Sequence, residues 1–274
     1  YYSEQALAIW RKARNRSQEA EMVKNLAWIH FHQENYQEAR HGFDQALVLM
    51  QVHNLPYSQP DWWENTAEVD LAQGKLGEAL TSYEKALADI SGNSVPLWKC
   101  NLVYFVGQTL ARLGDLDTGE ARLQDALLKA RRLNSQVIEM NVLPWLGWLS
   151  LRRGQPETAL DYCQQDVALI QQVGNQRVEA QATFFLGQAL EALGRLDEAA
   201  STYQSALQLY LGQHLVKASQ EVRAALARLA LKRGDLEDAR QQVGLIQQHL
   251  RNSNLEGTIE PHEIERVCKQ VMDA

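Results

Sequence analysis

The sequence has few cysteines, and their spacing suggests neither a metal site nor a disulfide framework. Cys100, Cys163 and Cys268 are the three cysteines of 274 residues, without a CxxC pair or a Cys/His spacing typical of zinc. Cysteines this few and this far apart fit a reducing compartment, so we expect a cytoplasmic location. No metal or other cofactor is expected.

Long apolar runs and a strong excess of basic charge are also lacking. No stretch reaches the roughly 18 apolar residues of a membrane-spanning helix, and the first residues do not resemble a secretory signal. Acidic residues outnumber basic ones by 34 to 27, and the two signs are mixed along the chain. Because phosphate binding needs a basic face, we expect neither nucleic acid nor a membrane as the main partner.

Motifs of the common enzyme classes are absent as well. The sequence contains no GxxxxGK[ST], GxGxxG, HExxH or GxSxG. His30 and His32 are two residues apart, so on a helix they face different sides. Glu64 and Glu68 share a helix face and could form a carboxylate pair. On a helical surface that is open to water, however, we expect them to form a solvated charged face. The sequence therefore predicts no enzymatic activity.

Glycines recur in this sequence at intervals of 40 residues. They are Gly74, Gly114, Gly154, Gly194 and Gly234. Each is followed five residues later by a small residue, namely Ala79, Gly119, Ala159, Ala199 and Ala239. A sixth copy, from Asn35 to Ala39, keeps the register without the glycine. A fixed period of this length predicts an array of one repeated unit.

The unit between Gln181 and Leu209 shows what is repeated. Apolar residues stand at helical spacing in its first half and again in its second half. Gly194 between the halves suits a helix end, because glycine adopts the left-handed conformation without a Cβ penalty. Gly187 and Ala199 stand where the two helices would cross, and small residues there allow close packing. Each unit is therefore predicted to be helix–turn–helix.

The segment LGQALEALGRLDEAASTYQSA carries the pattern L-G-x₂-L…A…Y-x₂-A, which recurs across residues 21–250. These columns resemble the tetratricopeptide repeat (TPR) family, whose period is usually about 34 residues. The longer unit is similar to the TPR arrays of bacterial signalling proteins, notably the sensor region of the maltose-activator (MalT-like) regulators. The resemblance implies an all-α, right-handed superhelical solenoid of about six to seven repeats.

We expect one domain over residues 1–274. The predicted repeats are 17–54, 58–92, 94–133, 136–173, 176–213 and 215–250. Residues 1–14 are interpreted as the second helix of a truncated repeat, so we infer a fragment of a longer protein. Residues 261–273 form an amphipathic last helix, either a cap or the first helix of another unit. The tail from residue 255 is similar to that of large bacterial ATPase-linked TPR proteins.

In TPR arrays the first helices line a concave groove, and the resemblance carries this role onto the matching columns. The implied groove residues are Lys24, Trp28, Tyr104, Gln108, Arg112, Asn141, Trp148, Arg152, Phe184, Gln188 and Arg228. Large aromatic rings beside Gln and Arg are typical of a site for a peptide or a small molecule. The alternative is that these rings pack against the second helix of the neighbouring unit.

The unit from Asn141 to Asp166 departs most from the pattern. Pro144 falls inside its predicted first helix, where proline leaves the carbonyl of Met140 without its donor. This kink is a candidate binding feature unless the helix starts later and Pro144 lies in its first turn. Asp166 replaces a small residue of the second helix, so we expect a looser or polar contact there.

Two functional hypotheses follow. The first is a non-catalytic interaction module that binds a peptide or protein segment in the groove, within a larger bacterial regulatory protein. The second is a small-molecule (inducer) sensor domain of a MalT-like transcription regulator. A chaperone-type carboxylate clamp is rejected, because only Lys24 matches its pattern and Glu64 and Glu68 would repel a carboxylate.

Overall fold

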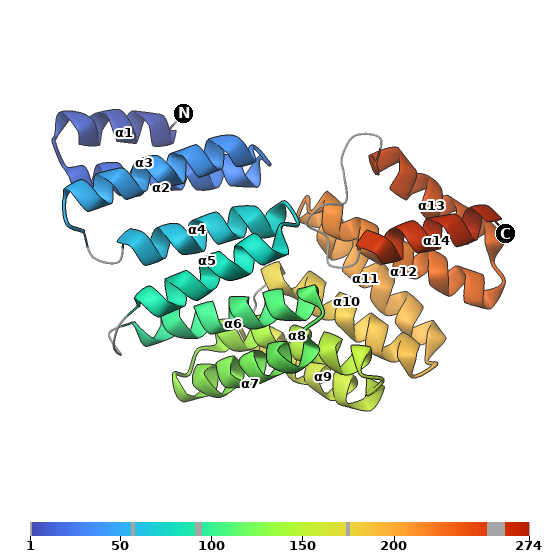
Figure 1. Ribbon diagram of the computed structural model, residues 1–274. Helices are drawn as coiled ribbons and strands as arrows, with labels where there is room; N and C mark the ends of the chain where they lie inside the picture. The colour runs from blue at the N-terminus through green and yellow to red at the C-terminus, as the bar shows by residue number, and fades with distance from the viewer. Residues whose placement is uncertain (1, 56–57, 91–94, 174–175, 251–260, 274) are drawn as a thin grey trace. The chain divides into compact units, whose positions relative to one another are not determined.

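The computed structural model describes residues 2–55, 58–90, 95–173, 176–250 and 261–273. All regular secondary structure in these ranges is helical, in 14 helices (Figure 1). The predicted all-α helical-repeat class is therefore confirmed.

The first and second helices of the helix–turn–helix repeats alternate along the chain. The first helices are α2 (Arg16–His32), α4 (Ser58–Ala72), α6 (Pro96–Leu113), α8 (Gln136–Arg152), α10 (Gln176–Ala192) and α12 (Val216–Arg233). The second helices are α1 (Tyr2–Lys12), α3 (Tyr36–Val52), α5 (Leu76–Asp89), α7 (Leu116–Arg132), α9 (Pro156–Val173), α11 (Leu196–Gly212) and α13 (Leu236–Leu250). The last helix is α14 (Pro261–Asp273). The predicted repeat limits stay predictions.

The chain divides into two compact units, Tyr1–Thr109 and Leu110–Ala274, called here the N-terminal and the C-terminal unit. In the N-terminal unit, Ala27 of α2, Phe43 of α3 and Val69 of α4 belong to one buried cluster. In the C-terminal unit, a buried cluster joins α12, α13 and α14. Successive helices thus bury their apolar stripes against each other within each unit.

The turns between first and second helices explain the 40-residue glycine period. All five glycines of the series have φ between 69° and 92°, a region that disfavours other residues. After Gly194, the amide of Arg195 donates to the carbonyl of Leu190 at 2.9 Å and so satisfies the end of α10. In the copy without glycine, Glu34 takes the same place with φ 61°. The turn geometry is therefore kept where the glycine is missing.

The small residue at position 187 is required by a close helix crossing. A Cβ on Gly187 would lie 2.6 Å from Cδ1 of Tyr203, and Tyr203 is fully buried. Real Cβ atoms do not approach other atoms so closely, so Tyr203 would have to move. This contact ties α10 to α11.

We expect Gly187→Ala to lower the free energy of unfolding by about 1–3 kcal/mol, because the new methyl group overpacks the crossing. Gly244→Ala is the matched control, since no atom beyond its chain neighbours and the nearby backbone of its own helix lies within 4 Å of the Cβ position on Gly244 in the middle of α13. There alanine should be neutral or stabilising through its higher helix propensity. Urea unfolding of both variants measures the difference, and equal stabilities would contradict the crossing.

Candidate functional site

Polar side chains of successive first helices meet in pairs that are 37 residues apart. Lys24 of α2 pairs with Asp61 of α4, and Glu191 of α10 pairs with Arg228 of α12. The offset is slightly below one 40-residue unit. Each pair therefore links the first helix of one repeat to the first helix of the next. The surface that the first helices form within each compact unit is called here the first-helix wall.

A hollow of about 480 Å³ lies on this wall in the N-terminal unit. It is lined by Ser17, Glu21, Lys24, Met50, Leu55, Asp61 and Trp98. The Lys24 ammonium nitrogen lies 3.2 Å from a carboxylate oxygen of Glu21 and 3.4 Å from one of Asp61. Apolar surface beside a few oriented polar groups is typical of a site for a ligand or a partner's side chain.

Glu64 of α4 adds a third carboxylate, next to Trp98, one of the residues that line this hollow. The indole nitrogen of Trp98 donates to one of its oxygens, and the Asn101 amide donates to the other at 3.5 Å. Burial raises the pKa of Glu64 to about 7, although both donors favour the ionised form. Burial also raises the pKa of Asp61, against the opposing charge of Lys24. Glu64 is half-buried and is bound by two side chains of the neighbouring first helix, so it departs from the fully solvated face that was expected.

Most aromatic rings predicted for the groove are buried. Tyr104, Trp148 and Phe184 are 7%, 4% and 3% exposed. The Phe184 ring centre lies 5.8 Å from that of Tyr203, and Trp148 lies 5.6 Å from Trp145. These rings are thus buried among other side chains. The alternative placed them against the second helix of the neighbouring repeat, whereas Phe184 contacts Tyr203 in the second helix of its own repeat. Their role in binding stays a prediction.

Other predicted groove residues are less buried. Trp28 is half-buried against Phe31 and Phe43, with ring centres 5.1 and 5.3 Å away. The Arg152 guanidinium is exposed and lies 5.0 Å from the Trp148 ring centre. Half-buried polar residues complete the set: Gln108, Arg112, Asn141, Gln188 and Arg228. Residues 24, 28, 104 and 108 lie in the N-terminal unit, and the remaining predicted residues lie in the C-terminal unit.

The repeat from Asn141 to Asp166, which departs most from the sequence pattern, contains buried polar groups without a hydrogen-bond partner in the described ranges. Pro144 lies inside α8, which begins at Gln136, so the alternative of a later helix start is wrong. Within the described part of the chain, the indole nitrogen of Trp145 has no hydrogen-bond partner, and neither has either oxygen of Asp166. Asp166 is fully buried, and burial raises its pKa to about 8. Of the two alternatives expected at Asp166, a looser or a polar contact, the polar one is therefore not formed with any described residue.

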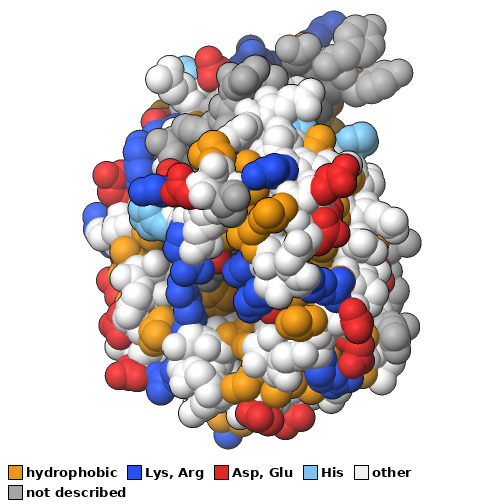
Figure 2. All heavy atoms as spheres, turned by 90° about the vertical axis from the view of Figure 1, so that its right-hand side faces the viewer, with side chains coloured by type: hydrophobic (Ala, Val, Ile, Leu, Met, Phe, Trp, Pro, Cys, Tyr) orange, Lys and Arg blue, Asp and Glu red, His pale blue; other side chains and the backbone are white. Residues whose placement is uncertain are grey.

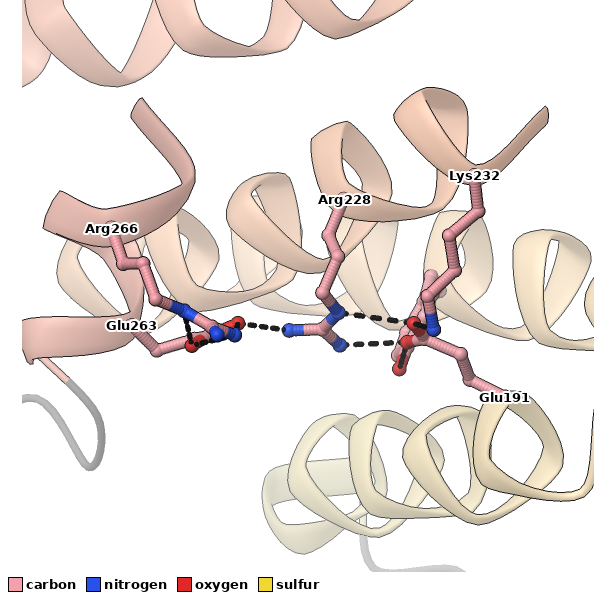
Figure 3. A network of polar contacts seen from close by, with 6 residues as sticks. Glu191, Arg228, Lys232, Glu263 and Arg266 are labelled. Atoms are coloured by element: carbon pink, nitrogen blue, oxygen red, sulfur yellow. Dashed lines mark hydrogen bonds and ion pairs between the residues drawn. The ribbon is translucent and has the colours of Figure 1, made fainter. Parts of the chain in front are cut away.

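Glu191 and Arg228 form the centre of a polar network in the C-terminal unit (Figure 3). Arg228 binds Glu191 with two nitrogens, at 3.0 and 2.6 Å. Glu191 also accepts from the Lys232 ammonium at 2.7 Å and from the Tyr203 hydroxyl at 2.8 Å. Burial opposes ionisation of Glu191, but these donors and charges outweigh it and lower its pKa to about 2.

The network continues to α14. The remaining Arg228 nitrogen donates to Glu263 at 2.7 Å, and Arg266 donates to the same carboxylate at 2.9 Å. Figure 2 shows Lys, Arg, Asp and Glu side chains interspersed with small groups of hydrophobic side chains on one face of the molecule.

Sequence reasoning missed Asp61, Trp98 and Glu263 as partners of wall residues. The available signal was the offset of about one repeat, since Lys24 and Asp61 are 37 residues apart and Arg228 and Glu263 are 35 apart. In the described residues, no group of three His, Cys, Asp or Glu side chains could hold a metal ion. Nor does that part of the chain contain a helix long and apolar enough to cross a membrane.

Family models match two segments of the C-terminal unit. Residues 140–211 and residues 220–244 each match a model of the tetratricopeptide repeat. These two segments carry tetratricopeptide repeats. The TPR resemblance derived from the 40-residue columns is thus confirmed. No curated protein matches the sequence significantly.

Solved structures of other TPR-like arrays superpose on the chain. The APC/C hetero-tetramer Cut9–Hcn1 has a TM-score of 0.72 and 16% identity, covering 99% of this chain and 46% of that one. The Rap conjugation gene regulator of plasmid pLS20, in complex with the Phr* peptide, has a TM-score of 0.70 and 14% sequence identity. The match covers 96% of this chain and 76% of that one.

A third structure is a STAND protein with a TPR sensor, PH0952 from Pyrococcus horikoshii. It has a TM-score of 0.63 and 13% identity, covering 97% of this chain and 41% of that one. The chain therefore spans less than half the length of this protein and of the matched chain of the Cut9–Hcn1 hetero-tetramer. At these identities the likeness shows the fold alone.

Proposed function

We propose that this chain is a non-catalytic interaction module that binds a peptide or protein segment along its first-helix wall. The hollow beside Lys24 is the observation that carries this proposal. It combines an oriented ammonium group and carboxylates with the apolar surface of Met50, Leu55 and Trp98. Such a surface can hold one side chain of an extended segment while the polar groups orient its backbone. The other predicted groove residues remain part of this proposal.

The likeness to the Rap regulator of pLS20 supports the proposal, because that protein's structure was solved with the Phr* peptide. We further propose that the chain works in the bacterial cytoplasm as part of a larger regulatory protein, with neither nucleic acid nor membrane as its partner. The three buried free cysteines are compatible with that compartment.

Panning a phage-displayed dodecamer library against the full chain tests this function. We expect the selected peptides to lose about tenfold in affinity for Lys24→Met, which keeps an apolar side chain but removes the charge at the hollow. Lys75→Met is the matched control, since Lys75 is exposed at the start of α5 and does not line the hollow. Fluorescence anisotropy measures both affinities. Peptides that bind both variants equally would place the binding surface elsewhere.

The second candidate is a small-molecule sensor. A volume of about 480 Å³ falls in the usual range of small-ligand sites, roughly 300–1,000 Å³. The STAND protein with a TPR sensor shares the fold. A thermal-shift screen of sugars and other metabolites separates the candidates: stabilisation of the unmodified chain that disappears in Lys24→Met favours the sensor.

A further inference from the structure

Helix α14 is held on α12 and α13 by an apolar stripe. Ile264, Val267 and Val271 are 1%, 0% and 1% exposed. They share one buried cluster with Ala227 of α12 and Val243 of α13, among other residues. Spacings of three and four residues place the three side chains on one face of α14. The helix therefore supplies the apolar half of a helix–helix interface.

The polar half of this interface is a single carboxylate on an oriented arginine. Glu191 binds two nitrogens of Arg228 and thereby fixes the plane of its guanidinium. The third nitrogen points to α14 and donates to Glu263 at 2.7 Å (Figure 3). Charge-assisted hydrogen bonds to a fixed guanidinium depend strongly on geometry, so they select where a carboxylate must stand.

The position of α14 follows the register of the first helices. Arg228 and Glu263 are 35 residues apart, close to the 37 residues that separate Glu191 from Arg228. In sequence, ten residues separate α13 from α14, whereas two to six separate the other second helices from the next first helix. A helix joined through a longer linker has a lower effective concentration at its site, so an external helix competes with it more easily.

We propose that the surface of α12 and α13 under α14 is a docking site for an amphipathic helix, that α14 is its resident and exchangeable occupant, and that the Glu263–Arg228 contact selects the helix. The partner that fits carries a carboxylate in its first turn and apolar residues one, four and eight positions later, as Glu263, Ile264, Val267 and Val271 do. The inference does not rest on the hollow beside Lys24, so the two proposals fail independently.

The test uses the full chain and a fluorescein-labelled synthetic peptide with the sequence of residues 261–274 under reducing conditions. We expect Glu263→Gln in the chain to raise the affinity for the peptide by about tenfold, because α14 then competes less well for Arg228. Glu265→Gln is the matched control. It removes the same charge from the same helix, at an exposed position where the carboxylate lies 3.8 Å from the His262 ring. Fluorescence anisotropy gives both affinities.

Two further measurements make the outcome decisive. The peptide carrying Glu263→Gln should bind the Glu263→Gln chain several-fold more weakly than the unmodified peptide does. Hydrogen exchange of α14 amides should be faster in the Glu263→Gln chain than in the Glu265→Gln chain, with α10 unchanged. If the Glu263→Gln chain does not bind the peptide, or binds it no better than the Glu265→Gln chain, the proposal is overturned, whatever the exchange rates.

Discussion

Replacing Asp166 by alanine should raise the free energy of unfolding by about 2–4 kcal/mol at neutral pH. The carboxyl group is fully buried, and neither oxygen has a hydrogen-bond partner among the described residues. Burial raises its pKa from 3.8 to about 8, so at pH 7 folding must neutralise a group that is ionised in the unfolded chain. At about 1.4 kcal/mol per pKa unit, this penalty is of the stated order.

The sign of the pH dependence follows from the same shift. A carboxyl group whose folded pKa is raised binds more protons in the folded state, so its penalty grows as pH rises from about 4 to about 8. The gain from Asp166→Ala should therefore be small near pH 4, grow up to pH 8 and stay constant above it. Urea unfolding at several pH values measures this.

Asp161→Ala is the control for helix propensity, because Asp161 is exposed on the same helix α9. It should change stability by less than about 0.7 kcal/mol, the usual range of helix propensities, without the rise towards pH 8. A gain from Asp166→Ala that does not depend on pH would contradict the account of a buried neutral carboxyl group.

The fold could be predicted from the sequence because its determinants are local and repeated. Gly194 marks a turn that needs positive φ, and Gly187 marks a crossing that Tyr203 fills. Each signal recurs in the same register, so one unit explains the others. Where the signal fails, as at Glu34, packing of the flanking helices imposes the conformation on an unfavourable residue.

The candidate site could be predicted only in part. Matching the sequence columns to those of TPR first helices identified Lys24, which lines the hollow, and Arg228, the centre of the network. It cannot say whether a ring in a first helix is exposed or buried, and Trp148 is buried. Partners such as Trp98 depend on how adjacent units are offset, which is a property of packing between units.

Breaking the Glu191–Arg228 ion pair should cause the second large change in stability, a loss in the free energy of unfolding. Arg228→Met leaves the buried Glu191 carboxylate, 5% exposed, with Lys232 and Tyr203 alone. Removing one partner of a buried ion pair costs about 3–5 kcal/mol, so we expect a loss of this size at pH 7. Arg233→Met is the control on the same helix, because its partner Asp197 is fully exposed and such pairs contribute at most about 1 kcal/mol.

The pH dependence and a double variant identify the cause of this loss. The pKa of Glu191 is lowered from 4.5 to about 2, so its pairing stabilises the fold above pH 4.5 and is lost as pH falls through 2. The difference between Arg228→Met and the unmodified chain should therefore shrink in acid. Combining Arg228→Met with Glu191→Gln removes the buried charge and should recover part of the loss at pH 7. Additive losses in the double variant would mean that Arg228 stabilises the unit by packing, with its charge playing no part.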